Sequence, residues 1–271
     1  MMDPQEQSFD WKFILAMNLV YVLYYAIFTS ITLFVSALSK SSGISLVSLL
    51  AIWILSCLAI PKIASSYTNT KYPYPSRQQF QTAVAEDKRQ GVDGHDPWSK
   101  ASKQLAEETM KTYQVSSLEA LPFNFDAYRM QKGEEHEARV YFKHYEQLKS
   151  TYKEQTGVYQ KLAVFSPFLP VRFLSMSLAH TDYSTHWNFT DAAEKHRIEM
   201  QRILNTNFAE NSELGDWGYK ADESLLSEIP EFQFASLGFS ETVRSNQSNM
   251  SILFLWLFGS FGLLFLASKR L

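Results

Sequence analysis

The segment His180–Trp187, HTDYSTHW, contains the side chains best suited to bind a metal ion. Asp182 and His186 are four residues apart, so a helix would place them on one face, and His180 could join them from the preceding turn. Imidazole nitrogens and carboxylate oxygens are ligands that zinc takes in proteins. No second cluster of fixed spacing accompanies them, and interfacial histidines with hydrogen-bond partners would give the same pattern. We therefore assign no metal site from this pattern alone. If the chain did bind a metal ion, His180, Asp182 and His186 would be the candidate ligands.

A second group of titratable residues lies in Lys132–Gln147, KGEEHEARVYFKHYEQ. On a helix His136 and His144 are about 12 Å apart along the axis, too far to share an ion, and neither has a carboxylate three or four residues away. Aromatic and apolar residues recur at helical spacing at Tyr141, Tyr145, Leu148 and Tyr152. We predict a scaffold helix with a solvated charged face and an aromatic packing seam.

The chain lacks the common catalytic motifs. It contains no phosphate-binding G-x-x-x-x-G-K-[ST] loop, no G-x-S-x-G elbow, no H-E-x-x-H and no C-x-x-C. We therefore assign no catalytic residue and no cofactor, and we expect no enzyme activity. The net charge is −3 and the isoelectric point about 6.1, so the chain has no basic surface typical of nucleic-acid binding.

Three apolar stretches, at residues 13–38, 44–60 and 250–267, are free of charged residues. A membrane-spanning helix needs roughly 17–25 apolar residues, so each can cross a bilayer. Buried helices of a soluble protein would show a polar face, which the third stretch lacks apart from serines. The first stretch is not a signal peptide, because acidic residues precede it and its apolar run is too long.

These stretches predict a mainly α membrane protein with three transmembrane helices. We expect an N-terminal tail at 1–12 and a transmembrane hairpin at 13–62, whose second span ends at Pro61. A large, mostly helical domain at 63–249 is inserted between the second and third spans, and 250–271 forms the last span with a short cytoplasmic end. Lys40, Lys269 and Arg270 are predicted inside by the positive-inside rule, which places the polar domain outside the cytoplasm.

Periodicity and capping residues predict four helices and one extended segment in the polar domain. The expected elements are helices at 76–90, 96–113, 126–165 and 188–207, and a short strand or extended arm at 229–239. The apolar segment Ser166–Ala179 carries Arg172 and is short for a span. It is either an interfacial or re-entrant element, with Arg172 reaching the headgroups, or a buried core segment.

Polar or small residues form a stripe on each of the first two spans. The residues are Asn18, Tyr25, Thr29, Thr32 and Ser36 on the first span and Ser45, Ser48 and Ser56 on the second. In lipid such stripes mark helix packing or a pathway. No acidic or basic residue lies within a span, which argues against a proton relay or an ion pump.

Three long phrases of the chain are distinctive: PSRQQFQTAVAEDKRQGVDGHDP, LPFNFDAYRMQKGEEHEA and SPFLPVRFLSMSLAHTDYSTHWNF, at 75–97, 121–138 and 166–189. Together with the order of the spans and the closing SKRL, they resemble a family of bacterial ABC-2-type transporter permeases that carry a large extracytoplasmic domain of uncharacterised function. The resemblance covers nearly the whole chain from the first span onward.

The resemblance implies a permease subunit in the bacterial cytoplasmic membrane. Such a subunit pairs with a second permease chain, identical or different, and with a separate cytoplasmic ATPase, and it moves a substrate that the sequence does not specify. Members of the family have a further membrane half before the first span, so a fragment, a split subunit and a truncated product are all open.

Two other functions remain open. A membrane-anchored extracytoplasmic binding or signalling module would use the spans only as anchors and would not need the polar stripe of the first span. An extracytoplasmic metal-dependent enzyme would be centred on His180, Asp182 and His186.

Overall fold

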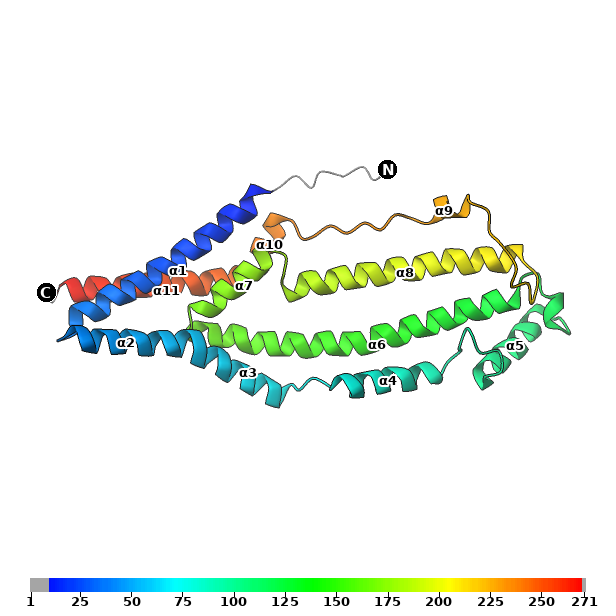
Figure 1. Cartoon of the computed structure of the whole chain (residues 1–271), viewed down its shortest axis with the longest axis horizontal. Helices are drawn as coiled ribbons and strands as arrows, with labels where there is room; N and C mark the ends of the chain where they lie inside the picture. The colour runs from blue at the N-terminus through cyan, green and yellow to red at the C-terminus, as the bar shows by residue number, and fades with distance from the viewer. Residues whose placement is uncertain (1–9, 270–271) are drawn as a thin grey trace. The chain divides into compact units, whose positions relative to one another are not determined.

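The computed structural model describes residues 10–269, which are mainly helical and contain no strand (Figure 1). The chain divides into two compact units. Unit 1 comprises Met1–Pro73, Thr151–Asn188 and Ala235–Leu271, and unit 2 comprises Tyr74–Ser150 and Phe189–Phe234. The segment predicted as one polar domain is therefore divided, because its residues 151–188 cluster with the apolar helices. Most of the predicted N-terminal tail, and Arg270, lie outside the described residues.

Three helices are long and apolar enough to cross a membrane, as predicted. The first is α1, Trp11–Leu38, and the third is α11, Gln247–Ser268. The second is the continuous helix Ser42–Lys71, which consists of α2 (Ser42–Ile54), the π-helical turn η1 (Leu55–Ala59) and α3 (Ile60–Lys71).

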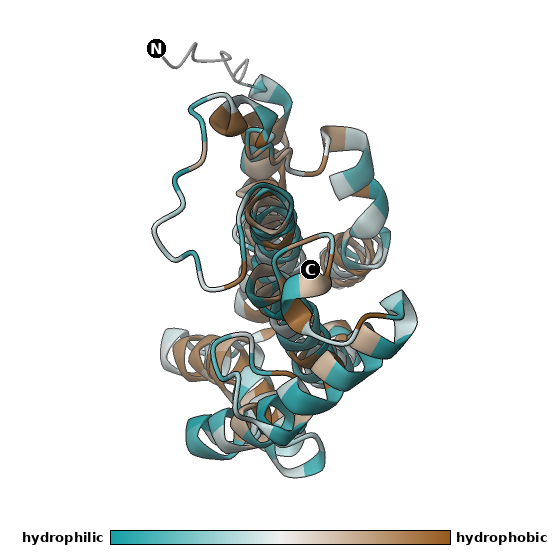
Figure 2. Cartoon of the chain, turned by 90° about the vertical axis from the view of Figure 1, so that its right-hand side faces the viewer, coloured by the Kyte–Doolittle hydropathy of each residue, from teal (hydrophilic) through white to brown (hydrophobic). Residues whose placement is uncertain are grey.

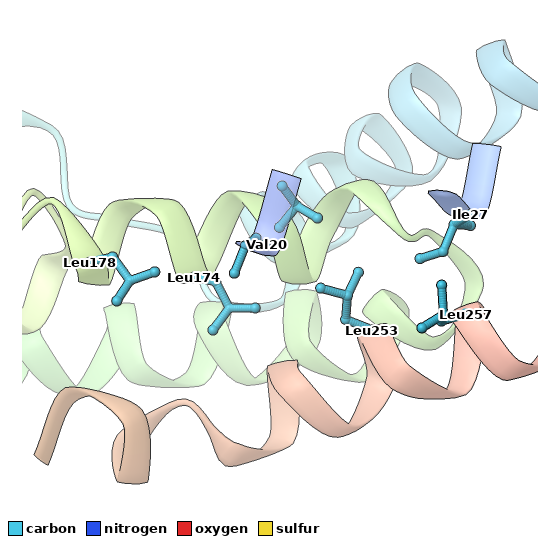
Figure 3. Close-up of a cluster of buried hydrophobic side chains, with 7 residues drawn as sticks. Val20, Ile27, Leu174, Leu178, Leu253 and Leu257 are labelled. Atoms are coloured by element: carbon cyan, nitrogen blue, oxygen red, sulfur yellow. The ribbon is translucent and has the colours of Figure 1, made fainter. Parts of the chain in front are cut away.

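The core of unit 1 lies among α1, α11 and α7, Phe168–Leu178 (Figure 3). Its buried side chains are Val20, Ile27, Val171, Leu174, Leu178, Leu253 and Leu257. Serines on both long helices, Ser30 and Ser260, are buried and donate to carbonyls of their own helix. Such small residues let membrane helices approach closely.

The segment Ser166–Ala179, which the sequence left open, forms part of this core. Val171, Leu174 and Leu178 of α7 pack in the same cluster as α1 and α11, while Arg172 is exposed. The segment is therefore buried, but it packs against the apolar helices α1 and α11 and not in a core of the polar domain.

The sequence placed the end of the second span at Pro61, but the helix that contains this span continues past the proline. Proline has no N–H and normally breaks a helix, but here the preceding turn widens to π geometry and the Ile60 amide donates to the Leu55 carbonyl. In that i→i+5 register the Ser56 carbonyl would need a donor from residue 61, which proline lacks. The Ser166 hydroxyl supplies it at 2.6 Å, in a site where Ser166 is fully buried. The helix consequently continues to Lys71.

Replacing Ser166 with alanine is expected to lower the free energy of unfolding by about 1–3 kcal/mol, because the Ser56 carbonyl loses its donor in an apolar site. Equilibrium unfolding of the full chain in mixed micelles measures this. The exposed Ser184→Ala control should stay within about 0.5 kcal/mol of the parent. Equal stability of the two variants would contradict this role of Ser166.

The helices of unit 2 begin at polar caps. A capping box formed by Ser76 and Gln79 starts α4, Arg77–Arg89, as predicted. The helix α5, Lys100–Tyr113, begins four residues later than predicted, because the Ser99 hydroxyl accepts from the Ser102 amide and Ser99, not Asp96, is the cap. Hydrophilic and hydrophobic residues both occur on the helices of the chain (Figure 2), as expected of amphipathic elements.

The two longest helices are α6, Phe125–Leu162, and α8, Tyr183–Asn211. Each contributes residues to both units. The predicted course of α6 is confirmed, with the 3₁₀ turn η3 (Ala163–Phe165) at its end. In contrast, α8 begins five residues before the predicted start, because Asp182 accepts from the Thr185 amide and caps it.

The remaining elements are short. They are the 3₁₀ turn η2 (Leu118–Ala120), α9 (Leu225–Glu228) and α10 (Phe239–Ser245). Between α9 and α10 the chain is extended without a ladder, so the extended-arm alternative describes residues 230–238.

Candidate functional site

A groove of about 440 Å³ lies among α4, α6 and α8 within unit 2. The residues that line it are Phe80, Gln81, Val84, Ala85, Lys88, Glu137, Tyr141, Tyr145, Glu194 and Arg197. Sequence reasoning identified Tyr141 and Tyr145 as a seam but missed Phe80, Glu194 and Arg197. The available signal was the i, i+3 spacing of Glu194 and Arg197.

Aromatic rings form one side of this groove. Tyr141 and Tyr145 stack with ring centroids 4.2 Å apart and an interplanar angle of 26°. The ring of Phe80 meets Tyr145 edge-on at 5.2 Å. Burial raises the pKa of the Tyr141 phenol, and Tyr145, Glu194 and Asp191 raise it further. Tyr141 therefore keeps its proton and can donate a hydrogen bond at neutral pH.

Ion pairs line the rest of the groove. Arg197 donates to Glu134 at 2.8 Å and to Glu194 at 2.9 Å, so it joins α8 to α6. Pairing with Glu194 raises the pKa of Arg197, burial opposes this, and Glu134 adds to the rise. Lys88 of α4 pairs with Glu137 of α6. The groove thus offers a flat apolar surface beside paired charges, which suits a ligand with a planar apolar part and a neutral or zwitterionic polar part.

The histidines of α6 face α4 instead of solvent. His144 is buried and donates from Nε2 to the Asp87 carboxylate at 2.8 Å, and Lys143 reaches the same oxygen at 2.7 Å. His136 Nε2 donates to the carbonyls of Asp87 and Lys88 at 3.1 and 3.2 Å. The face of α6 that was predicted to be solvated is therefore covered in part by α4. The sequence pattern of α6 did not reveal this contact because the partner, Asp87, lies on another helix.

Hydrogen bonds from Lys143 and then His144 lower the pKa of Asp87 below its usual 3.8. A group whose pKa is lower in the folded state stabilises the fold above its unfolded pKa, and this contribution is lost as the pH falls through the folded pKa. We therefore expect Asp87→Asn to flatten the loss of stability between about pH 5 and pH 2. Unfolding of the full chain in micelles across this range is the measurement, with the exposed Glu107→Gln as control. Parallel curves for Asp87→Asn and the parent would contradict the assignment.

The part of the chain that contains the groove is similar to a known protein family. A family model described as a domain of unknown function (DUF3526) matches residues 77–235, more than half of the chain. The chain belongs to the DUF3526 family. No curated protein and no solved structure matches it. The matched DUF3526 region holds every residue of the groove, whereas α1, α2 and α11 lie outside it.

The candidate metal ligands also fall in the DUF3526 region, but the structure gives them separate surroundings. The ring of His180 lies against Phe13, at a centroid distance of 4.7 Å. His186 lies beside Trp187 at 5.6 Å. Within residues 10–269 no three His, Cys, Asp or Glu side chains are grouped closely enough to hold an ion.

Asp182, the third candidate ligand, serves as a cap. Its carboxylate accepts from the Ser177 hydroxyl at 2.6 Å and from the Thr185 amide at 2.8 Å. Burial alone would raise the pKa of Asp182, but these hydrogen bonds outweigh burial and lower it. Both oxygens of Asp182 are therefore engaged in shaping the turn between α7 and α8.

The polar stripe of α1 lies outside the DUF3526 region and on the exposed side of the helix. Its members are Asn18, Tyr25, Thr29, Thr32 and Ser36. The face of α1 that packs within unit 1 carries Val20, Ile27 and Ser30 instead. At one end of the stripe the Ser36 and Ser45 hydroxyls share a hydrogen bond of 3.1 Å between α1 and α2.

The stripe of the second span faces the chain more than that of α1. Ser45 and Ser48 are half-buried and Ser56 is buried. Its residues therefore take part in packing within unit 1, whereas most of the α1 stripe does not.

Proposed function

We propose that this chain is a permease subunit of an ABC-2-type ATP-binding-cassette transporter in the bacterial cytoplasmic membrane. It would move a substrate together with a second permease chain, identical or different, and a separate cytoplasmic ATPase. Under this proposal the chain itself hydrolyses no ATP, and the part of the DUF3526 region that forms unit 2 lies on the outer side of the membrane.

The exposed polar stripe of α1 is the observation that carries the proposal. Asn18, Thr29 and Thr32 lie on a face that the chain's own helices leave uncovered. Polar side chains on a membrane helix are stabilised by contact with other helices rather than with lipid tails. A simple anchor has no use for such a face, whereas a subunit of a multi-helix assembly does. The resemblance of the long phrases to ABC-2-type permeases supports the same conclusion and supplies the kind of partner.

Co-purification from membranes in mild detergent tests this proposal. We expect the chain to bring down a second permease and an ATPase. Recovery of the chain alone would count against a transporter subunit.

Removal of the polar stripe is expected to weaken that association about twentyfold. The variant Asn18→Leu/Thr29→Val/Thr32→Val deletes three polar groups, each worth roughly 0.6 kcal/mol or more between membrane helices. The matched control Leu15→Ala/Leu33→Ala changes exposed apolar residues on the same helix and should leave the yield of partner unchanged. An equal yield from the stripe variant and its control would contradict this role of the stripe.

The groove of unit 2 favours a second candidate function, a membrane-anchored binding module without transport activity. Stacked Tyr141 and Tyr145, bordered by paired charges, form a surface that can bind a small molecule. The two functions separate in the same experiment, because an anchored module would purify without an ATPase and would be indifferent to the stripe variant.

A further inference from the structure

A second cavity, of about 240 Å³, lies in unit 1 among α1, α7, α10 and α11. Its walls are mainly apolar and include Leu19, Leu23, Leu174, Leu178 and Phe254. Leu174 and Leu178 belong to the buried cluster in Figure 3, and Leu23 packs against this cluster. Leu19 is 56% exposed and Phe254 39% exposed, so the cavity communicates with the surroundings of the two long helices.

The positions of the lining residues along α1, counted from the first turn of this helix, give the depth of the cavity in a bilayer. Trp11, in the first turn of α1, is 66% exposed, and exposed tryptophans are typical of the membrane–water interface. The lining residues Ala16–Leu23 follow five to twelve positions later, about 8–18 Å along the helix axis. In a hydrocarbon core of about 30 Å, whose midplane lies about 15 Å deep, this range extends from the middle of one leaflet's acyl chains to just past their ends.

The cavity, of about 240 Å³, has apolar walls that either an acyl chain or the apolar side chains of a neighbouring helix can contact. The charges at its interfacial end distinguish the two occupants, because an acyl chain belongs to a lipid that carries a phosphate.

Two basic residues lie at the end of the cavity nearest the interface. Lys12 precedes the lining residue Ala16 by one helical turn, on the same face of α1, and Arg244 follows the lining residue Val243. Both are exposed, and neither forms an ion pair within residues 10–269. The nearby acid Asp10 caps α1 by accepting from the Lys12 backbone amide.

We propose that this cavity holds one acyl chain of a phospholipid whose phosphate is contacted by Lys12 and Arg244. The apolar walls contact the acyl chain in place of neighbouring lipid tails. The side chains of Lys12 and Arg244 supply positive charges opposite the phosphate. This site is independent of the proposed transport function, because it requires only that α1 and α11 lie in the membrane.

Photo-crosslinking of the full chain in nanodiscs of phosphatidylcholine with a minority of phosphatidylglycerol tests the occupant. With p-benzoylphenylalanine at Leu19, intact-mass analysis should show an adduct of phospholipid mass. The same residue at Leu15, which is exposed on α1 outside the cavity, should give much less of this adduct. Equal adducts at the two positions, or an adduct to a second polypeptide at Leu19, would overturn the proposal.

Native mass spectrometry of the same nanodisc preparation tests the phosphate contact. Lys12→Gln and Arg244→Gln should each reduce retained phospholipid about fivefold, the effect of roughly 1 kcal/mol per basic residue at an anionic surface. Lys40→Gln and Lys269→Gln, outside the cavity lining, serve as controls and should change retention little. Retention that is the same in all four variants would overturn the role of the two bases.

Discussion

Replacement of Arg129 by methionine is expected to lower the stability of unit 2 by about 3–5 kcal/mol. Arg129 is only 4% exposed, and its guanidinium donates to Asp126 at 2.8 Å and to the Gly94 carbonyl at 3.3 Å. The other Asp126 oxygen accepts from the Gly215 amide at 3.2 Å. Removal of one partner from a buried pair leaves an uncompensated charge, which is the reason for the large effect.

Hydrogen exchange of α6 amides in the full chain in micelles measures the effect of Arg129→Met. The exposed pair Arg202–Glu199 provides the control, since Arg202→Met should cost about 1 kcal/mol or less. The double variant Asp126→Asn/Arg129→Met should regain part of the loss, because no unpaired charge remains buried. A loss for Arg129→Met no larger than for Arg202→Met would contradict this account of the pair.

The second large effect is expected at Gly133, where a glycine permits two backbones to touch. A Cβ on Gly133 would lie 2.5 Å from the Gly94 nitrogen and 2.7 Å from its Cα, both of them backbone atoms that cannot rotate away. Gly133→Ala should therefore push the 91–97 loop off α6 and cost about 2–3 kcal/mol.

Gly157 is the matched control for this substitution, because it lies on the same helix and a Cβ there meets nothing within 4 Å. Gly157→Ala should stabilise α6 by up to about 1 kcal/mol through helix propensity alone. The two variants are thus expected to change stability in opposite directions in the same exchange experiment. A stabilising Gly133→Ala would show that the loop does not pack on α6 as described.

Local signals in the sequence predicted much of the helical fold. Three uncharged apolar stretches predicted the three long helices, and Ser76, as a capping residue, predicted the start of α4. Both signals act within a few residues of the structure that they specify, so a single sequence contains them. Pro61 misled the prediction because its missing donor is replaced by Ser166, 110 residues from Ser56.

The candidate site was harder to predict from the sequence than the helices, because contacts between residues far apart in the chain form it. Tyr141 and Tyr145 followed from helical spacing, but Phe80 and Arg197 reach the groove from other helices. Asp87 and His144 are 57 residues apart, and no periodicity links them. The candidate metal ligands failed to come together for a local reason that the spacing did not reveal, since Asp182 is engaged as a helix cap.

Labelling of single cysteines in intact cells tests the membrane account most directly. In a Cys57→Ser background, Glu107→Cys reports on the DUF3526 region and Ser41→Cys on the hairpin between the first two long helices. The account predicts that a membrane-impermeant maleimide labels Glu107→Cys in intact cells and labels Ser41→Cys only after lysis. If Glu107→Cys stays unlabelled until lysis, or if the chain remains soluble without detergent, the proposed arrangement is contradicted.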